Sequence, residues 1–209
     1  MITTEVEPAA RPKSAADRTG AFVGRTVSAL QEQYVRQPQP TSYARAALAQ
    51  LRRGLGKEVG RLPELLALTV DPSAPPPRGD APTRGEIAAH TALTLYGLHQ
   101  QSQSRRMHDP RTSFGSAVGS LRFRDGEEND GVMRRFQALA TASGMGEFVQ
   151  HTRGLITLLR AAERGFDYSR FARDLVHFQS PHGADRVRLA WGRDFFRITE
   201  PDKTTEETS

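Results

Sequence analysis

The stretch FVQHTRGLITLLRAAERGFDYSRFARDLVHF, residues 148–178, contains two amphipathic segments separated by a short break. Apolar side chains recur in its first half at seven- and four-residue intervals, as in Phe148, Leu155 and Leu159. That spacing places them on one face of an α-helix and leaves the charged residues on the other. A second seam of the same period follows Gly165, which we expect to end the first helix in a left-handed conformation. The stretch therefore predicts two packed, antiparallel helices.

The same helical period continues through most of the chain, and no segment alternates with period two beside a hairpin signal. We therefore predict an all-α protein, a helical bundle of about eight to nine helices. Residues 71–82 read DPSAPPPRGDAP and are either a connector between two small lobes or a surface loop within one domain. The predicted segments are a disordered N-terminal tail at 1–16, an N-terminal helical lobe at 17–70, a Pro-rich linker at 71–82, a C-terminal helical bundle at 83–198 and an acidic disordered tail at 199–209.

Basic charge in this sequence comes almost entirely from arginine, which supplies 26 of the 29 basic residues. The two ends, residues 1–10 and 198–209, contribute −2 and −3, so with a net charge of +5 the segment between them carries +10. A guanidinium is permanently charged, and its fork of N–H groups matches phosphate oxygens. The charge predicts binding of a polyanion such as nucleic acid, although ordinary solvated helix faces also account for charged residues.

Sequence features for catalysis, metal binding and membrane insertion are missing. There is no cysteine, and the six histidines form no compact ligand set, so we predict neither a metal site nor a cofactor. The segment 54–57 departs from the spacing of a phosphate-binding loop, and 115–119 departs from that of a nucleophile elbow. No apolar run is long enough to span a membrane, and the N-terminal sequence lacks the order of a secretory signal. We predict a non-enzymatic, cytoplasmic protein.

Several elements of the C-terminal part are similar to those of one known protein family. They are LYGLHQQSQ (95–103), MH (107–108) followed by SFGSAVGSLR (113–122), VMRRFQALATA (132–142), FVQHTRGLITLLRAAERGFDYSRFARDLVHF (148–178) and VRLAWGRDFF (187–196). Over residues 85–196 the chain resembles the CasB family, the small subunit of the type I-E CRISPR surveillance complex called Cascade. The likeness rests on the order and character of the helices, because no catalytic signature defines the family.

The resemblance implies a non-catalytic, all-helical subunit of a ribonucleoprotein that acts in antiviral defence. Its partners would be guide RNA, both strands of target DNA, other subunits of the complex and a second copy of itself. In RNA-guided systems base pairing reads the sequence, while the protein holds the backbone through positive charge. The residues alone leave two other functions open: a helical protein–protein scaffold whose arginines meet acidic surfaces, and a helical DNA-binding regulator.

The candidate nucleic-acid-binding residues are all arginines: Arg122, Arg134, Arg135, Arg153, Arg105, Arg106, Arg52, Arg53 and Arg45. The first four lie in elements that resemble the family, the next two lie just before the MH element, and the last three rest on helical spacing alone. Most aromatic residues near the C-terminus have the spacing of a buried seam. Phe196 is the exception, and it stays open as a residue that stacks on bases.

Overall fold

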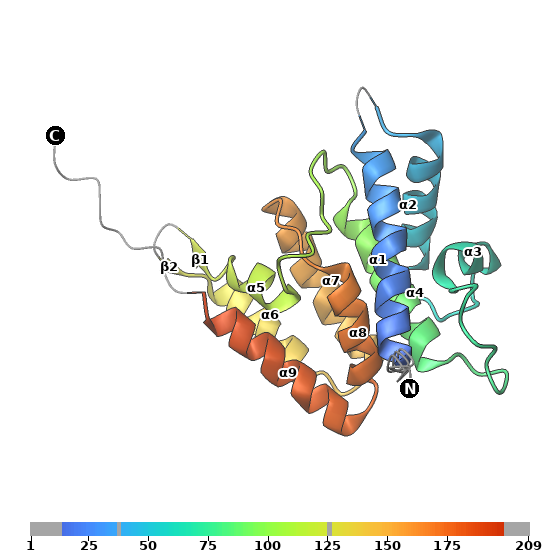
Figure 1. Cartoon of the computed structure of the whole chain (residues 1–209). Coiled ribbons are helices and arrows are strands. Elements are labelled where there is room, and N and C mark those ends of the chain that lie inside the picture. The colour runs from blue at the N-terminus through green and yellow to red at the C-terminus, as the bar shows by residue number, and fades with distance from the viewer. Residues whose placement is uncertain (1–13, 37–38, 125–126, 199–209) are drawn as a thin grey trace, which may run out of the picture.

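The structure, a computed structural model, describes residues 14–36, 39–124 and 127–198. Nine α-helices form within these residues, which confirms the predicted all-α class (Figure 1). They are α1 (Ala15–Tyr34), α2 (Ser42–Gly54), α3 (Leu66–Thr69), α4 (Arg84–His99), α5 (Phe114–Gly119), α6 (Asp130–Thr141), α7 (Met145–Ala161), α8 (Tyr168–Phe178) and α9 (Pro181–Phe196). A single 3-10 turn, Pro63–Leu65, precedes α3.

Side-chain caps set the starts of several helices. At α4, Thr83 Oγ1 accepts a hydrogen bond from the Glu86 N–H at 3.2 Å, and the Glu86 carboxylate accepts one from the Thr83 N–H at 2.7 Å. This pair is the capping box that the sequence predicts. Helix α1 begins at Ala15, capped by Ser14, so the predicted tail 1–16 is helical in its last two residues. The rest of that tail, and the predicted tail 199–209, lie outside the described residues.

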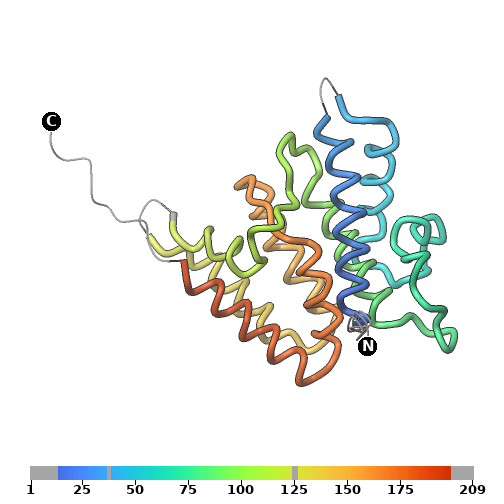
Figure 2. Tube along the Cα trace, viewed as in Figure 1, coloured from blue at the N-terminus to red at the C-terminus, as the bar shows by residue number. Residues whose placement is uncertain are grey.

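Helix α4 lies at the centre of the fold and is buried on nearly every side. It packs against α1, α2, α7 and α8. In the Cα trace of Figure 2 it passes behind α1. Gly97 allows α4 to lie close to α2, because a Cβ there would lie 2.8 Å from Leu51 Cβ and 3.2 Å from the Arg52 nitrogen. A helix with so few polar side chains is stable in water only when its neighbours cover it, so α4 organises the core.

Aromatic side chains join the C-terminal helices to this core. The Phe171 ring of α8 lies 5.1 Å from Phe114 of α5 and 5.8 Å from Trp191 of α9, centre to centre. Phe148 of α7 closes the cluster against Trp191 at 5.9 Å. Rings at these distances and tilts gain attraction beyond their buried area. The seam that the sequence predicts along 148–178 is therefore a real packing surface.

The segment 71–82 is exposed along nearly its whole length and runs along one side of the molecule (Figure 1). Apolar residues from 17–70 and from 83–198 belong to one hydrophobic core. In particular, α1 packs along α8 and α4. The described residues of the two predicted lobes therefore share one interior, and their division at 71–82 stays a prediction.

One small hairpin departs from the sequence prediction, which contained no strand. Strands β1 (Phe123–Arg124) and β2 (Glu127–Glu128) pair antiparallel. The dipeptide Asp125-Gly126 stands between them in the sequence and is a strong signal for a two-residue hairpin turn. The prediction was wrong because strands of two residues are too short to show alternation.

A buried polar network joins α4 to α8. His99 Nδ1 lies 3.0 Å from the Tyr168 hydroxyl, and both side chains are fully buried. Burial lowers the pKa of His99 from its ordinary value of 6.5 to about 3, so the imidazole is neutral in the folded protein. Burial also lowers the pKa of His90 and of His108. All three groups bind protons more readily in the unfolded chain than in the folded one.

We predict that acidification destabilises the fold before its carboxylates titrate. The unfolded chain takes up a proton at His99 near pH 6.5 and the folded chain does not, so the free energy of unfolding is constant above that pH and falls below it. For His99 alone the loss is about 1 kcal/mol between about pH 6 and about pH 5. Urea titrations at several pH values measure it. His99→Leu lacks this titration and should show a shallower dependence, and equal slopes in both proteins would contradict the assignment.

Candidate nucleic-acid interface

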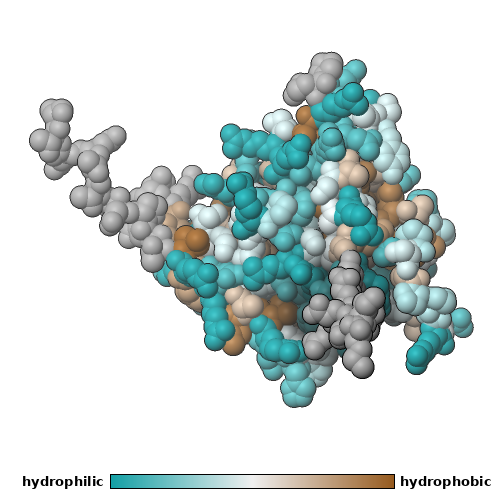
Figure 3. Space-filling model, in the orientation of Figure 1, coloured by the Kyte–Doolittle hydropathy of each residue, from teal (hydrophilic) through white to brown (hydrophobic). Residues whose placement is uncertain are grey.

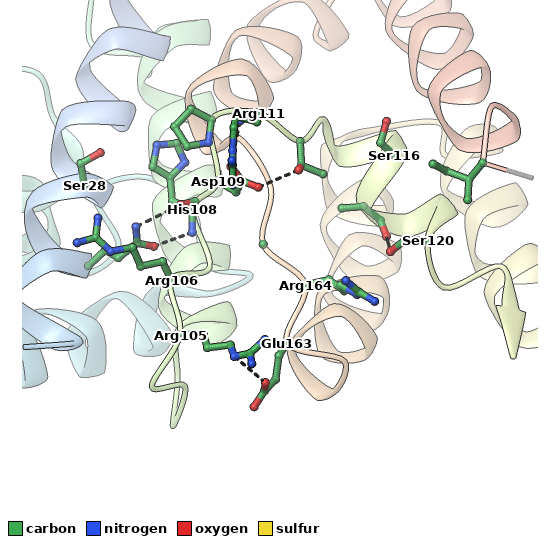
Figure 4. Close-up of a pocket in the computed structure, with 16 residues that line it drawn as sticks. Ser28, Arg105, Arg106, His108, Asp109, Arg111, Ser116, Ser120, Glu163 and Arg164 are labelled. Carbon is green, nitrogen blue, oxygen red and sulfur yellow. Dashed lines mark hydrogen bonds and ion pairs between the residues drawn. The ribbon is translucent and has the colours of Figure 1, made fainter. Parts of the chain in front are cut away.

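A groove of about 900 Å³ opens between α1, the loop that follows α4, helix α5 and the turn that follows α7. Figure 4 shows Arg105 and Arg106 on one side, Ser116 of α5 and Ser120 just after it on the other, and Arg164 between them. The lining residues are Ser28, Gln31, Arg105, Arg106, His108, Asp109, Pro110, Arg111, Thr112, Ser116, Ala117, Ser120, Glu163, Arg164, Gly165 and Ile198. Four of them are arginines and two are carboxylic acids, so the groove is basic.

The loop between α4 and α5, residues 100–113, contains three of the groove arginines and is called the arginine loop below. The fully buried side chain of Gln100 holds this loop in place. Its amide nitrogen donates to the Arg105 carbonyl at 2.8 Å and to the Gln103 carbonyl at 3.1 Å. Its amide oxygen accepts from the Met107 N–H at 3.1 Å. Because buried backbone groups need partners, one side chain that satisfies three of them fixes the path of the loop and the base of Arg105.

Gln31 of α1 braces the next residues of the same loop. Its amide oxygen accepts from the His108 N–H at 2.7 Å, and its amide nitrogen donates to the His108 carbonyl at 3.2 Å. On the other side, the Phe166 N–H donates to the Met107 carbonyl and the Asp109 N–H donates to the Phe166 carbonyl, both at 3.1 Å. The loop is thus held between α1 and the turn after α7, which brings two arginine-bearing segments together.

The turn after α7 corrects the predicted role of Gly165. The left-handed residue that ends α7 is Glu163, with φ of 53°. The Glu163 N–H donates to the Arg160 carbonyl and the Arg164 N–H donates to the Leu159 carbonyl, the bond pattern of a Schellman motif. Gly165 serves a different need, because a Cβ there would lie 3.0 Å from the carbonyl oxygens of the arginine loop. The sequence shows that a glycine is needed here but not which constraint requires it.

Ion pairs engage two of the four groove arginines. Arg105 Nε lies 3.2 Å from the Glu163 carboxylate, and Arg111 Nε lies 3.2 Å from Asp109. Partial burial raises the pKa of Asp109, but hydrogen bonds from Arg111 and Thr112 outweigh this effect, so its pKa lies below the ordinary value and it is a carboxylate at neutral pH. Within the part of the chain that the structure describes, the other two groove arginines, at 106 and 164, form no ion pair.

Three other predicted arginines lie on α6 and α7, and all three are exposed: Arg134, Arg135 and Arg153. The Arg135 side chain lies across α7, since its Cδ is 3.7 Å from the position of a Cβ at Gly154. Its guanidinium donates to the Gly131 carbonyl at 2.9 Å. Helices α6 and α7 pack against each other, and none of these three arginines lines the groove, so they add basic charge outside it.

The remaining predicted arginines lie elsewhere. Arg122 pairs with Glu128 at 2.8 Å, and its side chain is only 20% exposed. The candidates on α2, at 45, 52 and 53, do not line the groove, and Arg53 lies 3.9 Å from Glu64. The structure therefore places two of the nine predicted residues, at 105 and 106, in the groove. The prediction did not select Arg111 or Arg164, which also line the groove, and Arg164 lies beyond the end of α7.

No helix among the described residues is both long and apolar enough to cross a membrane. Within 14–36, 39–124 and 127–198, no three His, Asp or Glu residues are grouped so that they could hold a metal ion. The groove itself is lined by guanidinium groups, hydroxyls and two carboxylates, and its guanidinium groups are suited to binding anions.

The profile of a family described as CRISPR-associated protein Cse2 matches residues 47–196, most of the chain. The crystal structure of CasB from Thermobifida fusca superposes with a TM-score of 0.72 and 37% sequence identity, covering 85% of this chain and 97% of that one. The chain belongs to the Cse2 (CasB) family. No curated protein matches the sequence.

Membership in the Cse2 family confirms the resemblance to CasB of type I-E Cascade that the sequence predicts. The match also extends further toward the N-terminus than the predicted 85–196, because the Cse2 profile begins inside α2. In the structure α2 packs on α4, so the part of the match before residue 85 belongs to the same core as the rest.

We predict opposite effects on stability for two exchanges at the wall of the groove. Glu163→Gly should raise the free energy of unfolding by about 0.5–1 kcal/mol, because a Cβ strains the left-handed backbone. Gly165→Ala should lower it by about 1–3 kcal/mol, because its Cβ would press on the carbonyl groups of Arg106 and Met107, and the Met107 carbonyl is held by a hydrogen bond from the Phe166 N–H. Urea titration measures both.

Glu163→Gln is the control, since it keeps the strained backbone and removes only the charge. It should change stability by much less than Glu163→Gly, because the exposed pair with Arg105 contributes little. If Gly165→Ala stabilises the protein, the arginine loop can move away from the turn after α7. That outcome would contradict the conclusion that hydrogen bonds hold this loop in place.

Proposed function

We propose that this Cse2 family member is a non-catalytic subunit of a CRISPR RNA-guided surveillance complex and that it holds nucleic-acid backbone. Its role would be to stabilise the guide RNA–target DNA hybrid and the displaced strand, alongside other subunits and a second copy of itself, in the cytoplasm. Family membership supports the assignment to Cascade. The binding of nucleic acid is inferred from the groove.

The observation that carries this proposal is the pair Arg106 and Arg164. Both side chains are exposed, both line one concave surface, and neither has an ion-pair partner among the described residues. Guanidinium groups in such a place lower the free energy of a phosphate backbone that lies between them, because each contact releases a condensed counterion. Concave geometry selects a strand over a flat acidic surface.

The four arginines of the groove suit contacts with backbone phosphates, and this fits the proposed role. Sequence recognition in an RNA-guided complex comes from base pairing, while the protein contributes contacts to the backbone. Exchange of a DNA duplex for an RNA–DNA hybrid is nearly balanced in energy, so a few backbone contacts can shift it. The exposed arginines of α6 and α7 would extend the same kind of contact beyond the groove.

We predict that Arg106→Ala combined with Arg164→Ala weakens binding of a single-stranded oligonucleotide and flattens its salt dependence. Each lost phosphate contact should reduce the slope of log affinity against log salt by about 0.7 for a single strand, so the double variant should lose about 1.4. Fluorescence anisotropy at several salt concentrations measures the slope. The loss should be similar for all sequences, because backbone contacts do not distinguish bases.

Two further variants complete this test. Arg134→Ala combined with Arg135→Ala should also flatten the slope, by an amount that reports how far the strand extends onto α6. Arg78→Ala removes an exposed arginine in the connector 71–82, away from the groove, and should leave the slope unchanged. Wild-type affinity that does not respond to salt would contradict the proposed function.

A further inference from the structure

Phe196, the last residue of α9, has a half-exposed aromatic ring that neither the core nor the groove accounts for. Its relative exposure is 53%, while the adjacent Phe195 is completely buried. We propose that Phe196, supported by Arg122, is a stacking platform for an unpaired nucleobase. The proposal rests on the proposed function and deepens it, because it specifies single-stranded nucleic acid as the ligand at this end of the groove.

The ring of Phe196 packs against two neighbouring side chains, Phe195 and Arg122. It meets the Phe195 ring at 4.9 Å and 84°, and Phe195 in turn stacks on Phe136 of α6 at 4.1 Å. The Arg122 guanidinium lies 5.1 Å from the centre of the Phe196 ring, and Glu128 holds that guanidinium at 2.8 Å. A planar ring that is already immobilised loses little conformational entropy when a base stacks on it.

The electrostatics of this corner also fit a base better than a phosphate. Glu128 neutralises Arg122, which is 20% exposed, so the platform itself carries no free cation for a phosphate oxygen. A guanidinium next to an aromatic ring instead polarises the stack and attracts another π-face. Bases stack on such platforms with little sequence preference, which matches a subunit that does not read sequence.

The platform adjoins the groove through the end of α5. Ser120 and Ile198 line the groove, and Gly119 lies so close to α9 that a Cβ would be 2.6 Å from the Phe195 carbonyl oxygen and 3.1 Å from Ile198. Figure 3 shows hydrophobic surface at the C-terminal end of α9, with hydrophilic surface next to it. A strand that leaves the groove over Ser120 and Ile198 therefore reaches an exposed ring, the combination of cationic track and aromatic platform found in single-strand binding.

Leu189 provides a matched control on the same helix. Its exposure is also 53%, and it lies seven residues before Phe196, two turns along the same face of α9. Leucine has no π-face, so a role in stacking belongs to Phe196 alone. A docking surface for another protein would use both side chains, and this difference separates the two kinds of ligand.

The experiment measures affinity of the full chain for a labelled oligothymidylate, for an abasic strand with the same number of phosphates, and for a duplex. Phe196→Ala should weaken oligothymidylate binding about fivefold or more, the effect of losing one stacked base, with an unchanged salt slope. Binding of the abasic strand and of the duplex should not change.

Three further variants serve as controls. Phe196→Leu should behave like Phe196→Ala, Phe196→Trp should bind at least as tightly as wild type, and Leu189→Ala should bind like wild type. Thermal unfolding of each variant verifies that the fold is intact.

Several outcomes would overturn the inference. Equal losses on oligothymidylate and on the abasic strand, or no loss on either, would show that no base stacks on Phe196. If Phe196→Ala and Leu189→Ala both keep full oligothymidylate affinity but fail to assemble with the other subunits of the complex, the face of α9 is a protein contact. If Arg106→Ala with Arg164→Ala weakens binding and Phe196→Ala does not, only this inference fails. If wild-type binding ignores both salt and the groove arginines, the proposed function fails with it.

Discussion

A short backbone bridge between His108 and Phe166 holds the basic groove together, because it joins two loops that lie far apart in the sequence. One loop follows α4 and the other follows α7, and each bears arginines. Gln31 of α1 stabilises this bridge, because its side chain forms hydrogen bonds with both the N–H and the carbonyl of His108. Unpaired polar groups at such depth would cost several kcal/mol in total, at about 1–3 kcal/mol each, so the loops have little freedom to separate.

Most helix boundaries in this fold follow from local sequence signals that can be recognised without the structure. The capping box at Thr83 joins residues three positions apart, the Asp167 side chain caps residues two and three positions away, and Pro181 is the first residue of α9. The errors have the same origin. The hairpin at 123–128 is too short for its period to be visible, and the role of Gly165 depends on a loop almost sixty residues earlier, which no local rule can see.

The candidate site was less predictable than the fold because it depends on distant pairings. Composition and the family resemblance predict that arginines bind the nucleic acid, and two of the predicted arginines, Arg105 and Arg106, line the groove. Whether a given arginine is available depends on neighbouring carboxylates, such as Glu128 for Arg122. Nor does the sequence reveal that two buried glutamines, Gln31 and Gln100, shape the loop, since an isolated Gln normally indicates a solvated surface.

Two of the four groove arginines are paired with carboxylates, and this pairing affects how the groove would bind a nucleic-acid strand. Arg105 is oriented by Glu163 and Arg111 by Asp109, so both guanidinium groups are positioned before any ligand arrives. The Arg105 pair is largely exposed and contributes little stability, so a phosphate can replace the carboxylate at small cost. With four arginines against two carboxylates, the attraction is real but moderate. A moderate, salt-sensitive grip suits a protein that must hold a strand along its backbone and still allow base pairing to determine whether that strand stays.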